Sequence, residues 1–194
     1  MKITRIIILC LTFAYTLIRY IGFGDVDITQ IPVFLINKSI SMSSVIFLFL
    51  SAYYFSKNQT TKSKFWGKDA FFSAILHILF SLSILSDSYY SKLFMAGRLT
   101  WQGGLFILFG ILAIFLFFIY KNSEINDRQC RKYCQLAMFC LFFHLFFLGS
   151  SGWFNINSWH GYLPPISLIS FLFVLASQIS YLKKTKRKMK TQIV

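Results

Sequence analysis

The sequence predicts an all-α membrane protein, a bundle of six transmembrane helices with both chain ends in the cytoplasm (N-in/C-in). Hydrophobic residues make up 56% of the 194 residues and charged residues only 13%, whereas a soluble domain has roughly 25% charged residues. Six apolar segments each approach the roughly 20 residues that a helix needs to cross a bilayer. Basic residues cluster between alternate segments, and the formal net charge is +14.

The first three expected spans are residues 5–22, 40–56 and 70–86. The first has the basic start and apolar run of a signal peptide, but no small-x-small cleavage site follows, because the chain continues Ile-Gly-Phe-Gly-Asp. It is therefore expected to remain as a membrane helix. The third span contains a histidine, His77, in an otherwise apolar stretch.

The last three expected spans are residues 102–120, 133–149 and 163–182. The fourth carries small residues, including Gly103, Gly110 and Ala113, which indicate close helix packing in lipid. The fifth contains a second apolar-span histidine, His144. The sixth begins at a Pro-Pro pair, which suits a helix start because the first N–H groups there need no intrahelical partner.

The connectors predict the orientation. Sixteen of the twenty Lys and Arg residues lie on the side that also holds both chain ends. Short cytoplasmic loops carry the excess of basic residues, so this side is expected to be cytoplasmic. The short loops and the lack of sorting signals favour a bacterial inner membrane. Such clusters differ from the spread basic surface of a nucleic-acid binder. The four basic residues on the opposite side are Arg19, Lys38, Lys92 and Arg98.

His77 and His144 are the candidate functional residues. Ionisable groups inside membrane spans are costly and commonly functional. Their two spans run parallel, and the rise of 1.5 Å per residue puts the two imidazoles at depths that agree within roughly one helical turn. Two imidazoles on separate helices can ligate one metal centre, and haem iron is the usual centre held in this way. Two ligands are too few for a closed zinc site.

Several stretches around these histidines resemble the ferric reductase-like transmembrane family, the haem-binding module also found in NADPH oxidases and STEAP metalloreductases. They are the His77 stretch at 74–82 with 88–94, Gly-Arg-Leu-Thr-Trp at 97–101, and the run from 143 to 171 that includes His144, Trp153 and Trp159. The resemblance covers about residues 40–180. It divides the chain into residues 1–39 (first helix and outer connector), 40–182 (haem-binding domain) and 183–194 (basic cytoplasmic tail).

The resemblance implies one b-type haem with His77 and His144 as axial iron ligands, and no catalytic side chain. Many family members carry two such histidines on each span and bind two haems, whereas this chain has one per span. The chain also lacks a Gly-x-Gly-x-x-Gly nucleotide fingerprint. The expected function is therefore that of an electron-transfer subunit of an oxidoreductase. It would need a separate donor, a flavoprotein reductase carrying FAD or a membrane quinol.

The outer connectors hold a candidate acceptor site of four residues, Arg98, Trp153, Trp159 and His160. The alternative is an aromatic belt at the membrane interface. A second function also stays open, a haem-free transporter or accessory subunit in which His77 and His144 relay protons or pack between helices.

Overall fold

The computed structural model describes residues 1–24, 31–122 and 127–191. Of these, 84% are helical, so the all-α class is confirmed. Six helices are long and apolar enough to cross a membrane, which indicates a multi-pass integral membrane protein. They are α1 (Lys2–Leu17, extended by the π-helical turn η1, Ile18–Gly22), α2 (Ile31–Ser56), α3 (Thr60–Ser83), α4 (Trp101–Asn122), α5 (Asp127–Trp153) and α6 (Ile166–Thr191).

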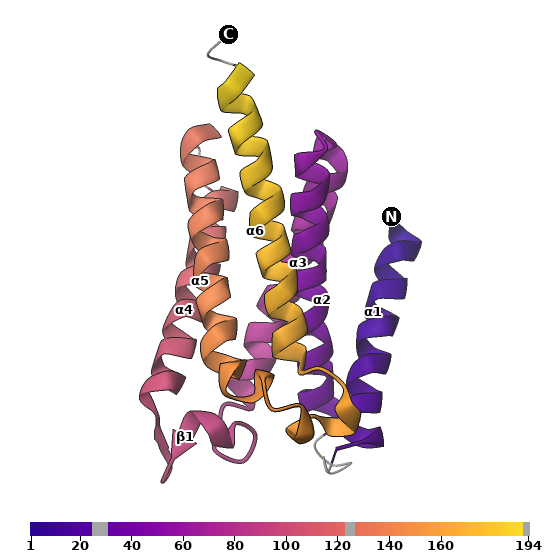
Figure 1. Cartoon of the computed structure of the whole chain (residues 1–194), viewed down its shortest axis with the longest axis vertical. Coiled ribbons are helices and arrows are strands. Elements are labelled where there is room, and N and C mark those ends of the chain that lie inside the picture. Colours follow the sequence, from indigo (N-terminus) through magenta and orange to yellow (C-terminus); the bar gives the residue numbers. More distant parts are fainter. Residues whose placement is uncertain (25–30, 123–126, 192–194) are drawn as a thin grey trace.

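The short elements all lie in two connectors at one end of the bundle (Figure 1). Both chain ends are directed toward the opposite end, together with the α2–α3 turn. This is the arrangement that an even number of crossings requires. The short elements are η3 (Ser91–Leu93), β1 (Phe94–Met95), β2 (Arg98–Leu99), η4 (Ile156–Ser158) and η5 (His160–Tyr162).

The second helix corrects the sequence prediction. α2 begins at Ile31 instead of residue 40, so the expected boundary between residues 39 and 40 falls inside a continuous helix. Asn37 and Lys38 are therefore helical residues within a span and not connector residues. The hydropathy pattern places the start of this span too late in the chain. It treats Asn37 and Lys38 as unfavourable in a span because it does not include their partners on other elements.

Part of the topology prediction lies outside the described side chains. The basic residues concerned are Lys121, Arg128, Arg131, Lys184, Lys186, Arg187, Lys188 and Lys190, and residues 192–194 of the tail lie outside the described chain.

The helices pack in the order α3, α2, α6, α5, α4, and α1 lies against α2. Within the described residues, α3 has no extensive contact with α4 or α5. The connector that carries η3 joins these two ends of the row, because buried Leu93 packs at the start of α4 and its carbonyl accepts the Thr100 N–H at 2.8 Å. Gly103 makes this contact possible, since a Cβ there would lie 2.6 Å from the Leu93 carbonyl oxygen.

The small residues of α4 behave as predicted. Ala113 is buried in a cluster with Ala137 and Cys140 of α5. Gly110 faces α5 as well, where a Cβ would lie 2.7 Å from the imidazole of His144. Close packing in lipid depends on such residues because apolar burial gives no driving force between helices there.

Polar side chains attach α1 to the bundle. Thr12 shares hydroxyl hydrogen bonds with Ser43 at 2.6 Å and Ser39 at 3.2 Å on α2. At the connector end, Tyr15 donates to the Pro164 carbonyl at 2.6 Å, and buried Arg19 donates to the Leu163 carbonyl. The first helix is thus joined both to α2 and to the chain that leads into α6.

Candidate functional site

His77 is held by a polar network that begins on α2. Its Nδ1–H donates to the Asn37 Oδ1 at 2.6 Å. The Asn37 side chain is fully buried, and its Nδ2 donates to the Ser81 hydroxyl at 3.0 Å and to the Tyr90 hydroxyl at 3.2 Å. Ser81 lies one turn beyond His77 on α3, and Tyr90 lies in the connector after it. The network therefore fixes the imidazole from two helices and a loop.

Tyr90 belongs to this network as a neutral phenol. Burial raises the pKa of Tyr90 above the ordinary tyrosine value, whereas its hydrogen bonds with Ser81 and Asn37 act in the opposite direction. The net shift is upward, so the hydroxyl keeps its proton at physiological pH.

His144 is held by α4. Its Nδ1–H donates to the backbone carbonyl of Phe106 at 2.8 Å. The imidazole stacks on the Phe106 ring with 4.2 Å between centroids and an interplanar angle of 24°. This approach requires glycine at position 110, since a Cβ there would contact the Nδ1 atom. The local sequence of α4 thus supplies both the acceptor and the space for His144.

The two imidazoles have the same hydrogen-bonding state. In both, Nδ1 carries the proton because its partner is a carbonyl oxygen, so Nε2 keeps its lone pair. Among the residues that the structure describes, no hydrogen bond reaches either Nε2. Neither Nε2 is among the fully buried polar atoms that lack a partner, and both side chains are half-buried. Each imidazole therefore presents an accessible lone pair, which is the state of a histidine that binds a metal.

His77 and His144 lie on α3 and α5, which have no extensive contact with each other within the described residues. The link between the two imidazoles is electrostatic, since charge on His144 acts on His77. In the described part of the chain, no group of three or more His, Cys, Asp or Glu side chains gathers as a metal site. A metal centre at this place would thus have two protein ligands, one from each helix.

Lys38 lies beside this pair. Its ammonium group lies 5.1 Å from the centroid of the Phe34 ring and 4.8 Å from that of the Tyr90 ring. It interacts electrostatically with both His77 and His144. The site thus contains a cation in addition to the two imidazoles.

The four residues of the candidate acceptor site differ in burial and in their hydrogen-bond partners. Trp153 is 5% exposed, and its Nε1–H donates to the Ser167 hydroxyl at 3.0 Å, which places it in the bundle interior. Trp159 is half-buried and donates to the Gly152 carbonyl at 3.0 Å.

The other two acceptor-site candidates have different surroundings. His160 packs against Tyr20 of η1, with 6.0 Å between ring centroids. Arg98 is exposed on β2. Within the described ranges, no hydrogen bond, ion pair or ring contact joins Arg98 to Trp153, Trp159 or His160, so a shared acceptor site of these four residues stays a prediction.

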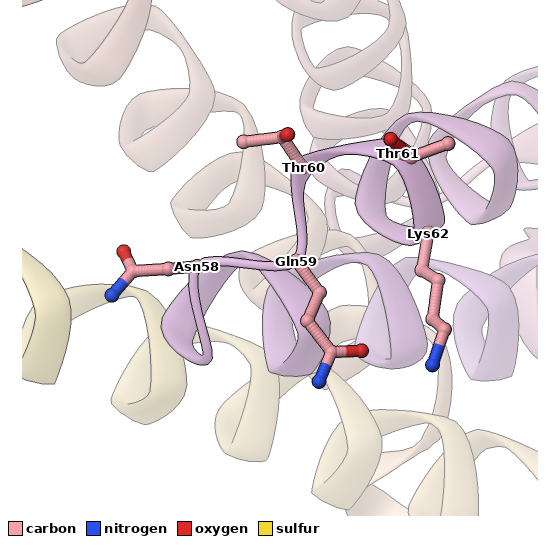
Figure 2. Close-up of a pocket in the computed structure, with 5 residues that line it drawn as sticks. All are labelled: Asn58, Gln59, Thr60, Thr61 and Lys62. Atoms are coloured by element: carbon pink, nitrogen blue, oxygen red, sulfur yellow. The ribbon is translucent and has the colours of Figure 1, made fainter.

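A shallow hollow lies at the opposite end of the bundle, at the α2–α3 turn. Its five lining residues are consecutive in the chain, and their side chains project in different directions (Figure 2). Because the side chains do not converge, the hollow has no arrangement that would select a ligand. Its residues are Asn58, Gln59, Thr60, Thr61 and Lys62.

Sequence reasoning missed the partners of the two histidines. The hydropathy pattern places Asn37 in the connector before the second span. In the structure it is a helical residue, and its buried partner is His77. Phe106 contributes its backbone carbonyl, which no side-chain pattern can indicate. Gly110 was recognised as a packing residue, but its neighbour is the functional candidate His144.

A comparison of the sequence with protein-family models finds no match, and a comparison with curated proteins finds none either.

Proposed function

We propose that the protein is a transmembrane electron-transfer subunit that binds one b-type haem through His77 and His144 and is of the ferric reductase-like type. Electrons would pass from a donor on the basic, cytoplasmic side to an acceptor at the outer face. One observation carries the proposal. Two imidazoles on separate helices each donate Nδ1–H to a carbonyl oxygen, and within the described residues no hydrogen bond reaches either Nε2.

The residues present suit haem. Outer-sphere hydrogen bonds to Nδ1 orient a ligating imidazole and raise its basicity, and Asn37 and Phe106 make these bonds here. Aromatic side chains surround the His144 side of the site, where Phe109 stacks on Phe143 at 5.2 Å and on Phe147 at 5.8 Å. Haem b with two imidazole ligands supplies reversible one-electron transfer, with a potential set by its ligands and surroundings.

The chain's own residues have three tasks in this proposal. His77 and His144 would hold the haem iron, one from α3 and one from α5. Asn37 and the Phe106 carbonyl keep both imidazoles in the tautomer whose Nε2 is free. The apolar helices exclude water from the site, so an electron can be held away from solvent protons and oxygen.

The donor must come from another component. Sixteen of the twenty basic residues lie on the side of the chain ends, which supports an N-in/C-in orientation in a bacterial inner membrane. The sequence holds no nucleotide-binding fingerprint, so the proposed donor is a flavoprotein reductase that docks on the basic side, or a membrane quinol. Membrane lipid is the only other partner proposed.

The visible spectrum of the purified protein tests the proposal. The full-length chain would be expressed with ample haem supply and purified in detergent. We expect a Soret band that sharpens and shifts when dithionite is added, together with resolved α and β bands of a six-coordinate haem. A colourless protein that also fails to bind added haem would overturn the proposal.

Replacement of Asn37 by leucine is expected to weaken haem binding by about tenfold to a hundredfold, the usual effect of losing an outer-shell partner of a metal-ligating histidine. Leucine fills a volume similar to that of asparagine, but it offers no acceptor to the His77 Nδ1–H. A haem titration of the variant monitored at the Soret band measures the effect. Ser83→Ala is the control, since Ser83 is exposed on the same helix and donates to the Phe80 carbonyl, and it should bind haem as the wild type does. Equal affinities of Asn37→Leu and wild type would contradict the assigned role.

A haem-free proton relay is the second candidate, and one observation favours it. The Ser81 hydroxyl lies 3.3 Å from the His77 Nδ1 and is hydrogen-bonded to Tyr90 of the outer connector, and hydroxyl groups can pass protons between an imidazole inside a span and that connector. This function requires no pigment. A colourless protein whose proton uptake in vesicles is lost in His77→Ala would support it over the haem function.

A further inference from the structure

Lys38 is placed unusually for a lysine. It lies in a membrane-spanning helix, next to the residue that holds His77, and its ammonium group lies over the rings of Phe34 and Tyr90. Phe34 lies one turn nearer the start of α2, and Tyr90 lies in the outer connector, so the charge of Lys38 is directed toward the connector end of the span. Tyr90 also belongs to the hydrogen-bond network of His77.

Among the residues that the structure describes, no carboxylate is a counter-ion for Lys38. The salt bridge found among the described residues joins Arg5 to Asp69 at 3.4 Å, on other helices. No carboxylate of the described chain pairs with Lys38, and no hydrogen bond satisfies its ammonium group. Two aromatic rings offset only part of the cost of removing an ammonium group from water. An anionic partner from outside the described chain would offset the remainder.

The charge also lies within reach of both imidazoles, because it interacts electrostatically with His77 and with His144. A group held between the two imidazoles is thus close to Lys38. Haem carries two propionate carboxylates on one edge of its ring, and these are the anions that such a group would bring.

We propose that Lys38 binds a propionate carboxylate of the haem. The inference rests on the proposed function and adds to it the residue that recognises the anionic edge of the cofactor. The other cations on this side are less suitable. Arg19 donates to a backbone carbonyl at η5, and Lys92 and Arg98 are exposed on the outer connector.

The experiment compares haem with its dimethyl ester, which has the same ring and iron but no propionate charge. Purified full-length protein would be depleted of haem and titrated with each compound, with binding followed at the Soret band. The variants are Lys38→Met, which keeps an apolar chain of similar length, and Lys38→Arg, which keeps the charge. Lys92→Met is the matched control, because it removes an exposed lysine from the neighbouring connector.

The wild type is expected to bind haem about tenfold or more tightly than the ester, since a charge-assisted pair in low dielectric is stronger than an exposed one. Lys38→Met should lose this preference by weakening haem binding and leaving ester binding unchanged. Lys38→Arg and Lys92→Met should retain the preference.

Two results would overturn the inference and leave the proposed function intact. One is an unchanged preference for haem in Lys38→Met. The other is equal weakening of haem and ester binding in that variant, which would assign Lys38 a structural role. Failure of the wild type to bind either compound would overturn the proposed function, and the inference with it.

Discussion

His144→Ala is expected to abolish haem binding. The variant removes one of the two proposed haem ligands and leaves the Phe106 carbonyl and the space beside Gly110 without the imidazole that they accommodate. Haem content should fall by more than about tenfold, because even the loss of an outer-shell partner costs that much. The ratio of Soret absorbance to protein absorbance in purified samples measures the effect, and His77→Ala should give the same result.

The third histidine provides the matched control for these variants. His160 packs against Tyr20 at the connector end of the bundle and has no contact with the two imidazoles of the site. His160→Ala should therefore bind haem as the wild type does. Normal haem content in His77→Ala or His144→Ala would exclude that residue as a ligand, and loss of haem in all three variants would indicate a general effect on folding.

Gly110→Ala is expected to displace His144 without changing any chemical group of the site. The added Cβ would lie 2.7 Å from Nδ1 and 3.0 Å from Cε1 of the imidazole, which is shorter than van der Waals contact. The ring must move from Phe106, so the hydrogen bond that holds the tautomer is lost or lengthened. Overpacking of this kind costs about 1–3 kcal/mol, and we expect a corresponding loss of haem affinity in a Soret titration.

The same helix contains the control for this prediction. A Cβ at Gly104 would meet no atom within 4 Å. Gly104→Ala should therefore retain wild-type haem affinity and be no less stable, because alanine favours a helix over glycine. If the two alanine variants bind haem equally well, the position of the His144 ring does not govern binding.

The membrane character of the chain and most of its helices follow from the sequence alone. A span is a local property, because about 20 consecutive apolar residues satisfy the bilayer whatever surrounds them. The six predicted segments each lie largely within one of the six helices. The small residues Gly110 and Ala113 also indicate close helix packing, since small side chains allow backbones to approach closely, and the structure shows that their partner is α5.

The start of α2 could not be predicted from local hydropathy. Asn37 and Lys38 interrupt the apolar pattern, and the energy that keeps them in a helix comes from Ser81 and Tyr90, which are distant in sequence. A polar group is tolerated inside a membrane bundle when a partner lies opposite, and that partner is set by helix packing. Trp153 is the opposite case. Its place near the end of a span predicts an interfacial residue, but helix packing buries it against Ser167 and Phe171.

The sequence by itself determined which segments are long and apolar enough to cross a membrane and that two histidines lie in them, because hydropathy and residue type are local. Only the tertiary structure decided that each histidine donates Nδ1–H to a carbonyl oxygen, and that Lys38 lies against Phe34 and Tyr90 with no counter-ion among the described residues. The reason is physical: the state of an imidazole depends on the atom opposite each nitrogen, and here those atoms are the Asn37 amide oxygen and the Phe106 carbonyl oxygen. Both belong to helices that meet the histidines only after the bundle has packed.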